Sequence, residues 1–90
     1  MLFVWQGFLN EGAEPDQQVQ WEVTDFLMQP AIPIRSAGAL RDEAGKRAGM
    51  LLIFEADDRA AAEALVATSP YLRAGLYREH HLFEYQNEVG

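Results

Sequence analysis

The stretch GMLLIFEADDRAAAEALVATSPYLRAGL, residues 49–76, decides the fold. The stretch begins with an apolar run that ends at the acidic Glu55, and this run predicts a strand over 49–56. The alanine-rich run over 59–68 predicts a helix, because alanine has the highest helix propensity and two preceding aspartates offer capping oxygens. Gly75 suits a helix C-cap and precedes a predicted strand over 76–85. This half of the chain is therefore strand, helix and strand.

The first half of the chain repeats that order. Apolar and aromatic residues over 2–8 predict a strand, and Asp16 suits the N-cap of a helix. Pro30 stops that helix, and a strand over 32–40 follows. A chain of 90 residues holds one domain. The sequence therefore predicts a single α+β domain, 1–90, with the ferredoxin-like βαββαβ layout.

This layout leaves one face of the sheet without helices. An apolar, aromatic sheet face must be covered, and a small domain with a thin core gains stability by pairing. We therefore expect a homodimer in which two sheets pack face to face as a dimeric α+β barrel.

The first helix has apolar residues on two sides. Its core stripe comprises Val19, Val23, Phe26 and Leu27. Trp21 and Met28 fall on the opposite side of the helix. Two large apolar residues there indicate a partner chain or a ligand cleft, or else a tryptophan that a loop partly covers.

Composition excludes several classes of function. The net charge of −7 and the lack of a basic cluster argue against nucleic acid and anionic membranes as partners. The absence of cysteine removes disulfides and thiolate chemistry and fits a cytoplasmic protein. We expect neither a signal peptide nor a membrane-spanning segment, because no basic n-region and no long apolar run is present. No nucleotide, haem or flavin motif is present, so no cofactor is predicted.

The last strand carries the candidate chemistry. Alternation places Tyr77, Glu79, His81, Phe83 and Tyr85 on one face. On that face Glu79 and His81 would lie about 6–7 Å apart, which suits an acid/base couple in a pocket. The same residues also suit solvated side chains or pairs across a dimer interface. His80 points to the other face, so the two histidines cannot chelate one metal ion, and no metal site is predicted.

Several motifs resemble those of the YCII-related (YciI-like) family. The matching residues of the second half are Glu55, Pro70, Tyr71, Ala74, Gly75 and Leu76. Ser36–Leu40 also resembles the family's second-strand segment, with Ala39 where proline is usual. The resemblance implies a ferredoxin-like protomer in a dimeric α+β barrel. It also implies a cleft served by a histidine and an aspartate. Most members have no assigned reaction, and at least one acts as a dehydrochlorinase on a chlorinated hydroxyhydroquinone, an activity that the resemblance only implies for this chain.

This chain departs from the family at both positions of that pair. Trp21 falls where the family has its helix histidine, and Ser69 falls where it has the aspartate of the turn. A tryptophan and a serine cannot form a general acid/base pair. Either the cleft binds aromatic or apolar material by stacking, or the family's site has been lost.

Two hypotheses on function remain open. In the first hypothesis, the chain is an enzyme that acts on a small ring substrate by proton transfer or elimination. Its catalytic residues would be His81 and Glu79, and its ligand pocket would comprise Trp21, Ser69, Tyr71 and Tyr77. Alternatively it is a non-catalytic, degenerate YCII-like homodimer that binds a small ligand or a partner protein.

Overall fold

The computed structural model of the chain describes residues 1–12, 17–29, 33–70 and 75–90. The elements are β1 (Leu2–Leu9), α1 (Gln17–Leu27), β2 (Ile34–Arg41), β3 (Arg47–Glu55), α2 (Arg59–Ala67) and β4 (Tyr77–Tyr85). The predicted βαββαβ order is confirmed, and the elements begin and end close to the predicted residues.

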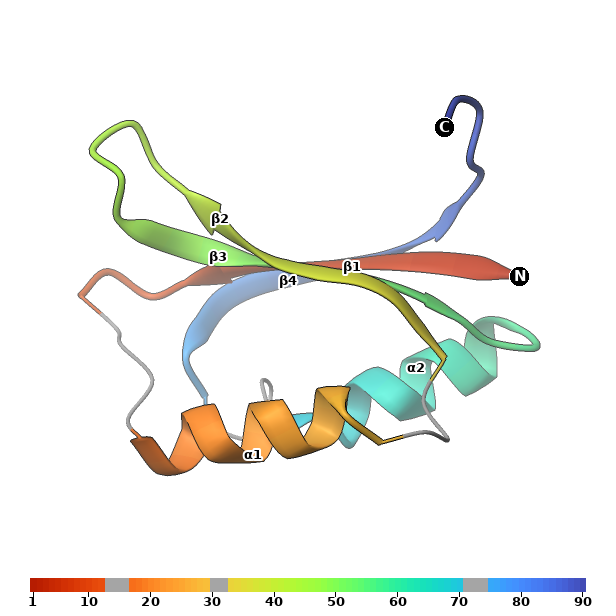
Figure 1. Cartoon of the computed structure of the whole chain (residues 1–90), viewed down its shortest axis with the longest axis horizontal. Helices are drawn as coiled ribbons and strands as arrows, with labels where there is room; N and C mark the ends of the chain where they lie inside the picture. Colours follow the sequence, from red (N-terminus) through yellow and green to blue (C-terminus); the bar gives the residue numbers. More distant parts are fainter. Residues whose placement is uncertain (13–16, 30–32, 71–74) are drawn as a thin grey trace.

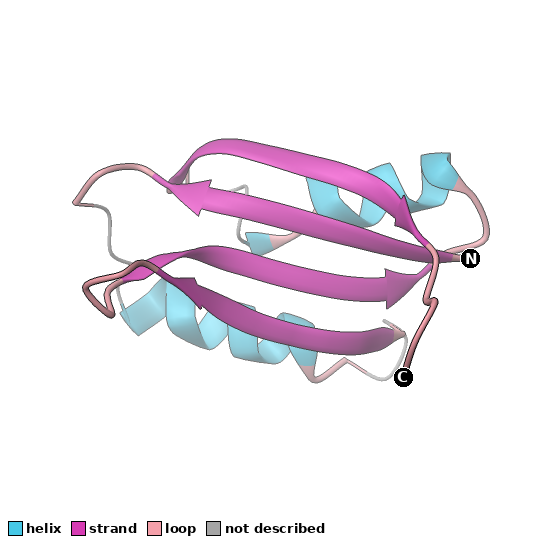
Figure 2. Cartoon of the chain, turned by 90° about the horizontal axis from the view of Figure 1, so that it is seen from above, coloured by secondary structure: helices cyan, strands magenta, loops and turns pink. Residues whose placement is uncertain are grey.

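The four strands form one sheet in the order β2-β3-β1-β4, and all neighbouring strands are antiparallel (Figure 2). Both helices lie on the same side of the sheet, as Figure 1 shows. The α+β ferredoxin-like fold is therefore confirmed. The sheet has a helix face, which α1 and α2 cover, and an open face, which neither helix covers.

The core lies between the helix face and the two helices. Alternate residues of β1 and β3 supply most of it, since side chains of a strand point to opposite faces in turn. The buried apolar residues are Phe3, Trp5, Phe26, Met50, Leu52, Phe54, Ala62 and Val66. The rings of Phe3 and Phe54 stack across β1 and β3 at 6.1 Å between centroids. The small side chain of Ala62 lets α2 pack closely against this layer.

Helix α1 carries the two apolar sides that the sequence predicts. Phe26 is buried, and Val23 and Leu27 pack partly against the core, whereas the side chain of Val19 lies outside what the structure describes. On the other side Trp21 is 59% exposed and Met28 is 75% exposed.

Helix α2 begins with the predicted aspartate cap. The Asp58 carboxylate accepts a hydrogen bond of 2.8 Å from the backbone N–H of Ala61, which satisfies one of the free donors at the helix start. Gly75 has φ +66°, a left-handed conformation that glycine adopts without strain, and it turns the chain toward β4.

Candidate functional site

Strand β4 forms an edge of the sheet and holds the candidate acid and base. Its register with β1 shifts near the start: Phe8 pairs with Glu79, but Leu9 pairs with Tyr77. Arg78 is therefore the extra residue of a β-bulge. A bulge interrupts the alternation of side chains, so residues before and after it need not share a face.

Beyond the bulge, one group of side chains gathers on the open face. This open-face cluster comprises Phe8, Arg78, Glu79, His81 and Phe83. Glu79 lies at its centre: one carboxylate oxygen is 3.2 Å from Nε2 of His81, and the other accepts from the Arg78 guanidinium at 3.1 Å. The side chains of His81 and Glu79 are about half exposed, at 45% and 46%. Solvent therefore weakens these ion pairs in the isolated chain.

Aromatic rings flank the Glu79–His81 couple. The His81 ring stacks on Phe83 with 6.0 Å between centroids, and it meets Phe8 edge-on at 6.3 Å. The Arg78 guanidinium also lies over the Phe8 ring, 5.9 Å from its centroid. The arrangement combines an imidazole, a carboxylate that orients it, and flat apolar walls. An imidazole that a carboxylate orients can accept and donate a proton, and flat apolar rings can stack on another ring.

A second cluster lies on the helix face and comprises Trp5, Tyr77 and His80. The Trp5 indole N–H donates a 3.2 Å hydrogen bond to Nδ1 of His80, and the Tyr77 ring meets the indole edge-on at 5.3 Å. Burial raises the pKa of Tyr77, and the Arg47 guanidinium lowers it in part. This tyrosine therefore keeps its proton at neutral pH.

The expectation that Tyr77 shares a face with Glu79 and His81 is wrong. Tyr77 packs against the core next to Trp5, on the opposite side of the sheet. The cause is the bulge at Arg78, which reverses the alternation of β4 at this point. Within one chain, Tyr77 cannot line the same surface as the Glu79–His81 couple.

Of the other predicted pocket residues, the structure describes Trp21 and Ser69. Trp21 lies exposed on α1, and Ser69 is 2% exposed, where its backbone N–H donates to the Val66 carbonyl just after α2. Tyr71 lies outside the described residues. The structure does not test whether these residues line a ligand pocket, so that role stays a prediction.

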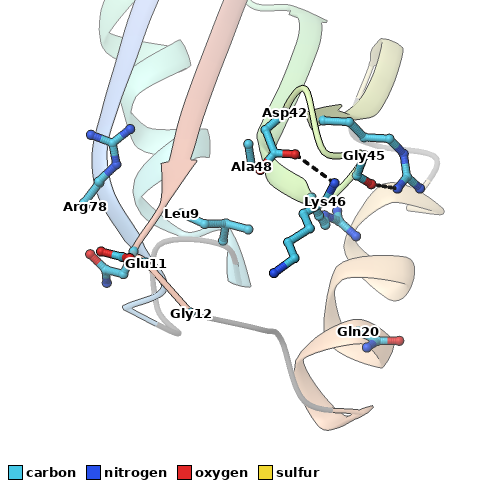
Figure 3. Close-up of a pocket in the computed structure, with 12 residues that line it drawn as sticks. Leu9, Glu11, Gly12, Gln20, Asp42, Gly45, Lys46, Ala48 and Arg78 are labelled. Atoms are coloured by element: carbon cyan, nitrogen blue, oxygen red, sulfur yellow. Dashed lines mark hydrogen bonds between the residues drawn. The ribbon is translucent and has the colours of Figure 1, made fainter.

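The structure contains a pocket of about 970 Å³ elsewhere, at the end of the sheet where the β2–β3 hairpin faces the loop after β1 (Figure 3). None of the described residues predicted for the site lines it. Sequence inspection missed it because the hairpin and the loop are far apart in the chain. In the described ranges, no group of three or more acidic or histidine residues is placed to hold a metal ion. No helix in those ranges is long and apolar enough to span a bilayer.

The model of the YCII-related domain matches residues 4–86. Among solved structures, the chain resembles 5-chloro-2-hydroxyhydroquinone dehydrochlorinase from Burkholderia phenoliruptrix AC1100 in complex with 2,5-dihydroxybenzoquinone. The TM-score is 0.75 at 18% identity, over 98% of this chain and 96% of that one. It also resembles Rv0793 from Mycobacterium tuberculosis, with a TM-score of 0.50 at 12% identity, over 99% and 97% of the two chains. No curated protein matches the sequence.

At these identities the two structures establish the shared fold alone, whereas the family match spans most of the chain. The chain belongs to the YCII-related domain family.

Proposed function

We propose that the protein is a cytoplasmic homodimer that acts on a small ring compound by proton transfer or elimination, without a cofactor. The observation that carries the proposal is the 3.2 Å contact between Glu79 and His81, flanked by the rings of Phe8 and Phe83. The dehydrochlorinase with the same fold, which was solved with a quinone bound, supports a ring compound as the ligand.

The roles of the couple follow from their chemistry. The Glu79 carboxylate accepts a hydrogen bond from one nitrogen of His81 and so orients the ring. The other nitrogen of His81 is then available to take a proton from a hydroxyl or ring carbon of the substrate. Arg78 holds the second oxygen of Glu79 and keeps the carboxylate in position.

The composition of the open face supports the homodimer in this proposal. The open face carries the partly exposed apolar residues Val4, Phe8, Leu51, Ile53 and Phe83. A second sheet packed on this face would remove these residues and the Glu79–His81 couple from water. Electrostatic interactions strengthen when water is excluded, so the couple would act more effectively in the dimer.

A thermal-shift screen with small phenols, quinones and lactones tests the proposal. Ligands that raise the melting temperature of the wild type should lose most of this effect with His81→Ala and with Glu79→Gln. Glu84→Gln, on the same strand, is the matched control and should respond like the wild type. Equal stabilisation of all four proteins would rule out the couple as the ligand site.

A non-catalytic role is the second candidate. It is favoured by Trp21 and Ser69, which stand where the family has its histidine and aspartate, and by the exposed Trp21 and Met28 surface of α1. Following a bound ring ligand by NMR over time separates the two candidates. Conversion that depends on His81 supports the enzyme, whereas stable binding without conversion supports the degenerate dimer.

A further inference from the structure

The pocket at the hairpin end of the sheet concentrates positive charge in an acidic protein. Its lining comprises Leu9, Asn10, Glu11, Gly12, Gln20, Arg41, Asp42, Gly45, Lys46, Arg47, Ala48 and Arg78. Four of the seven lysines and arginines of the chain are among these twelve residues, although the net charge is −7. The volume of about 970 Å³ is at the upper end of the range for small-molecule sites.

The β2–β3 hairpin is built so that its cations stay near the pocket. One Asp42 oxygen accepts 2.9 Å hydrogen bonds from the backbone N–H groups of Ala44 and Lys46, which closes the turn. Gly45 supplies the left-handed residue of the turn, and its carbonyl accepts from the Arg41 guanidinium at 2.8 Å. Internal bonds of the turn therefore engage Asp42 and Arg41, whereas none of them engages the ammonium group of Lys46.

Three of the four cations form no ion pair with any carboxylate of the described residues. Among the described residues, the arginine ion pairs are Arg35–Glu55, Arg59–Glu63 and Arg78–Glu79. These pairs include none of Arg41, Lys46 and Arg47. Arg47 instead donates to the Met50 sulfur at 3.5 Å, which is a weak acceptor. Unbalanced positive charge at a concave surface attracts an anion.

The side chains in Figure 3 indicate which cations face the pocket. Lys46 extends from the hairpin into the space on the side of Gly12, whereas the Arg78 guanidinium points away from Lys46. Arg78 is engaged with Glu79 on the open face. Lys46 is therefore the cation best placed to meet a bound anion, and Arg47 is the next cation of the lining without an ion pair among the described residues.

We propose that this pocket binds a small organic molecule through its oxyanion group, a carboxylate or a phosphate. Lys46 offers a mobile point charge, and Arg47 offers paired N–H donors that match two oxygens. Leu9 and Ala48 provide partial apolar cover for the body of the molecule. Glu11 in the lining disfavours ligands with many negative charges, so a single oxyanion group fits best. The proposal does not depend on the chemistry proposed for Glu79 and His81.

NMR titration of the full chain tests this site directly. The probes are benzoate, phenyl phosphate, inorganic phosphate and the uncharged benzyl alcohol. Benzoate or phenyl phosphate should cause saturable shifts in the amide signals of Leu9, Lys46 and Ala48. The affinity should fall as salt is added, because salt screens exposed charges. Benzyl alcohol, which lacks the anionic group, should bind at least tenfold more weakly, roughly the effect of one charged hydrogen bond. Inorganic phosphate, which lacks the organic body, should also bind more weakly than phenyl phosphate.

Variants separate the pocket from the general charge of the protein. Lys46→Gln and Arg47→Gln should each weaken binding roughly tenfold. Arg35→Gln removes the same charge from β2 outside the pocket and should bind like the wild type. Glu11→Gln should bind more tightly.

Three results would overturn the proposal. The first is that the ligand shifts only amide signals of residues outside the lining. The second is equal affinity for benzoate and benzyl alcohol, and the third is an equal loss of affinity in Lys46→Gln and Arg35→Gln. Inorganic phosphate that binds as tightly as phenyl phosphate would also overturn it, since the site would then hold a free ion.

Discussion

The indole Nε1 of Trp5 and the imidazole Nδ1 of His80 form a 3.2 Å hydrogen bond, although the residues are 75 positions apart in the chain. An indole N–H is only a donor, so Nδ1 of His80 must accept. The proton of the neutral imidazole therefore lies on Nε2, which fixes one tautomer of His80.

This bond predicts a change of tautomer when Trp5 is replaced. In the wild type, the neutral His80 ring should give the Nε2–H pattern in long-range proton–nitrogen spectra. Trp5→Phe removes the donor, and His80 should then show a mixture of tautomers. His81, which has no bond to Trp5, serves as the internal control. A predominant Nδ1–H form of His80 in the wild type would contradict the bond.

Gly7 leaves the space that the Trp5 indole occupies. A Cβ at this position would overlap the indole and lie 2.9 Å from the Tyr77 ring. Gly7→Ala should therefore lower the free energy of unfolding by about 1–3 kcal/mol, the usual cost of overpacking. Gly38→Ala on β2, where no atom lies within 4 Å of the added carbon, should change it by less than about 0.5 kcal/mol. Urea denaturation measures both, and equal effects would contradict the packing.

Tyr77 predicts a loss of stability in alkaline solution. Burial raises its pKa in the folded chain above the ordinary value of 10.0, and Arg47 only partly offsets this. The unfolded chain therefore loses the phenol proton first as the pH rises. The stability linked to Tyr77 is complete below its unfolded pKa and is lost as the pH rises through the folded pKa.

Tyr77→Phe should remove this part of the alkaline decline. Urea midpoints between about pH 8 and pH 11 measure it, and the wild type should fall more steeply than the variant at the upper end. The difference between the urea midpoints of the wild type and Tyr77→Phe at the lower end of that range gives the pH-independent effect of losing the hydroxyl. Parallel curves would show that the phenol does not titrate differently in the folded state.

The open face predicts the oligomeric state. Gel filtration with light scattering should give a dimer for the wild type. Phe83→Glu should give a monomer, because the new charge would have to be buried without a partner. Met28→Glu, at an exposed position of α1, should remain a dimer. A wild type that is monomeric would refute a dimer through the open face.

The sequence predicted the fold well because local signals agreed with the global arrangement. Asp58 caps α2 as expected, and the exposure of Trp21 on α1 follows directly from helical spacing. The same argument from periodicity placed Glu79 and His81 on one face of β4, where they are in contact.

The sequence did not predict the sorting of side chains at the start of β4. A bulge has no sequence signal at Arg78, and one extra residue was enough to move Tyr77 to the helix face. The pocket beside Lys46 was missed for another reason. Its walls come from the β2–β3 hairpin and from Leu9–Gly12, and only the tertiary structure brings them together.

The side chains of β4 face two chemical environments, and the bulge at Arg78 decides on which side Tyr77 lies. Tyr77 and His80 belong to the interior on one side, and Glu79 and His81 belong to the surface on the other. A substitution on one face of β4 can therefore leave the other face unchanged. Deletion of Arg78, by contrast, would move the side chain of Tyr77 from the helix face to the open face. The presence of one extra residue at position 78, more than the identity of that residue, determines on which face of the sheet Tyr77 lies.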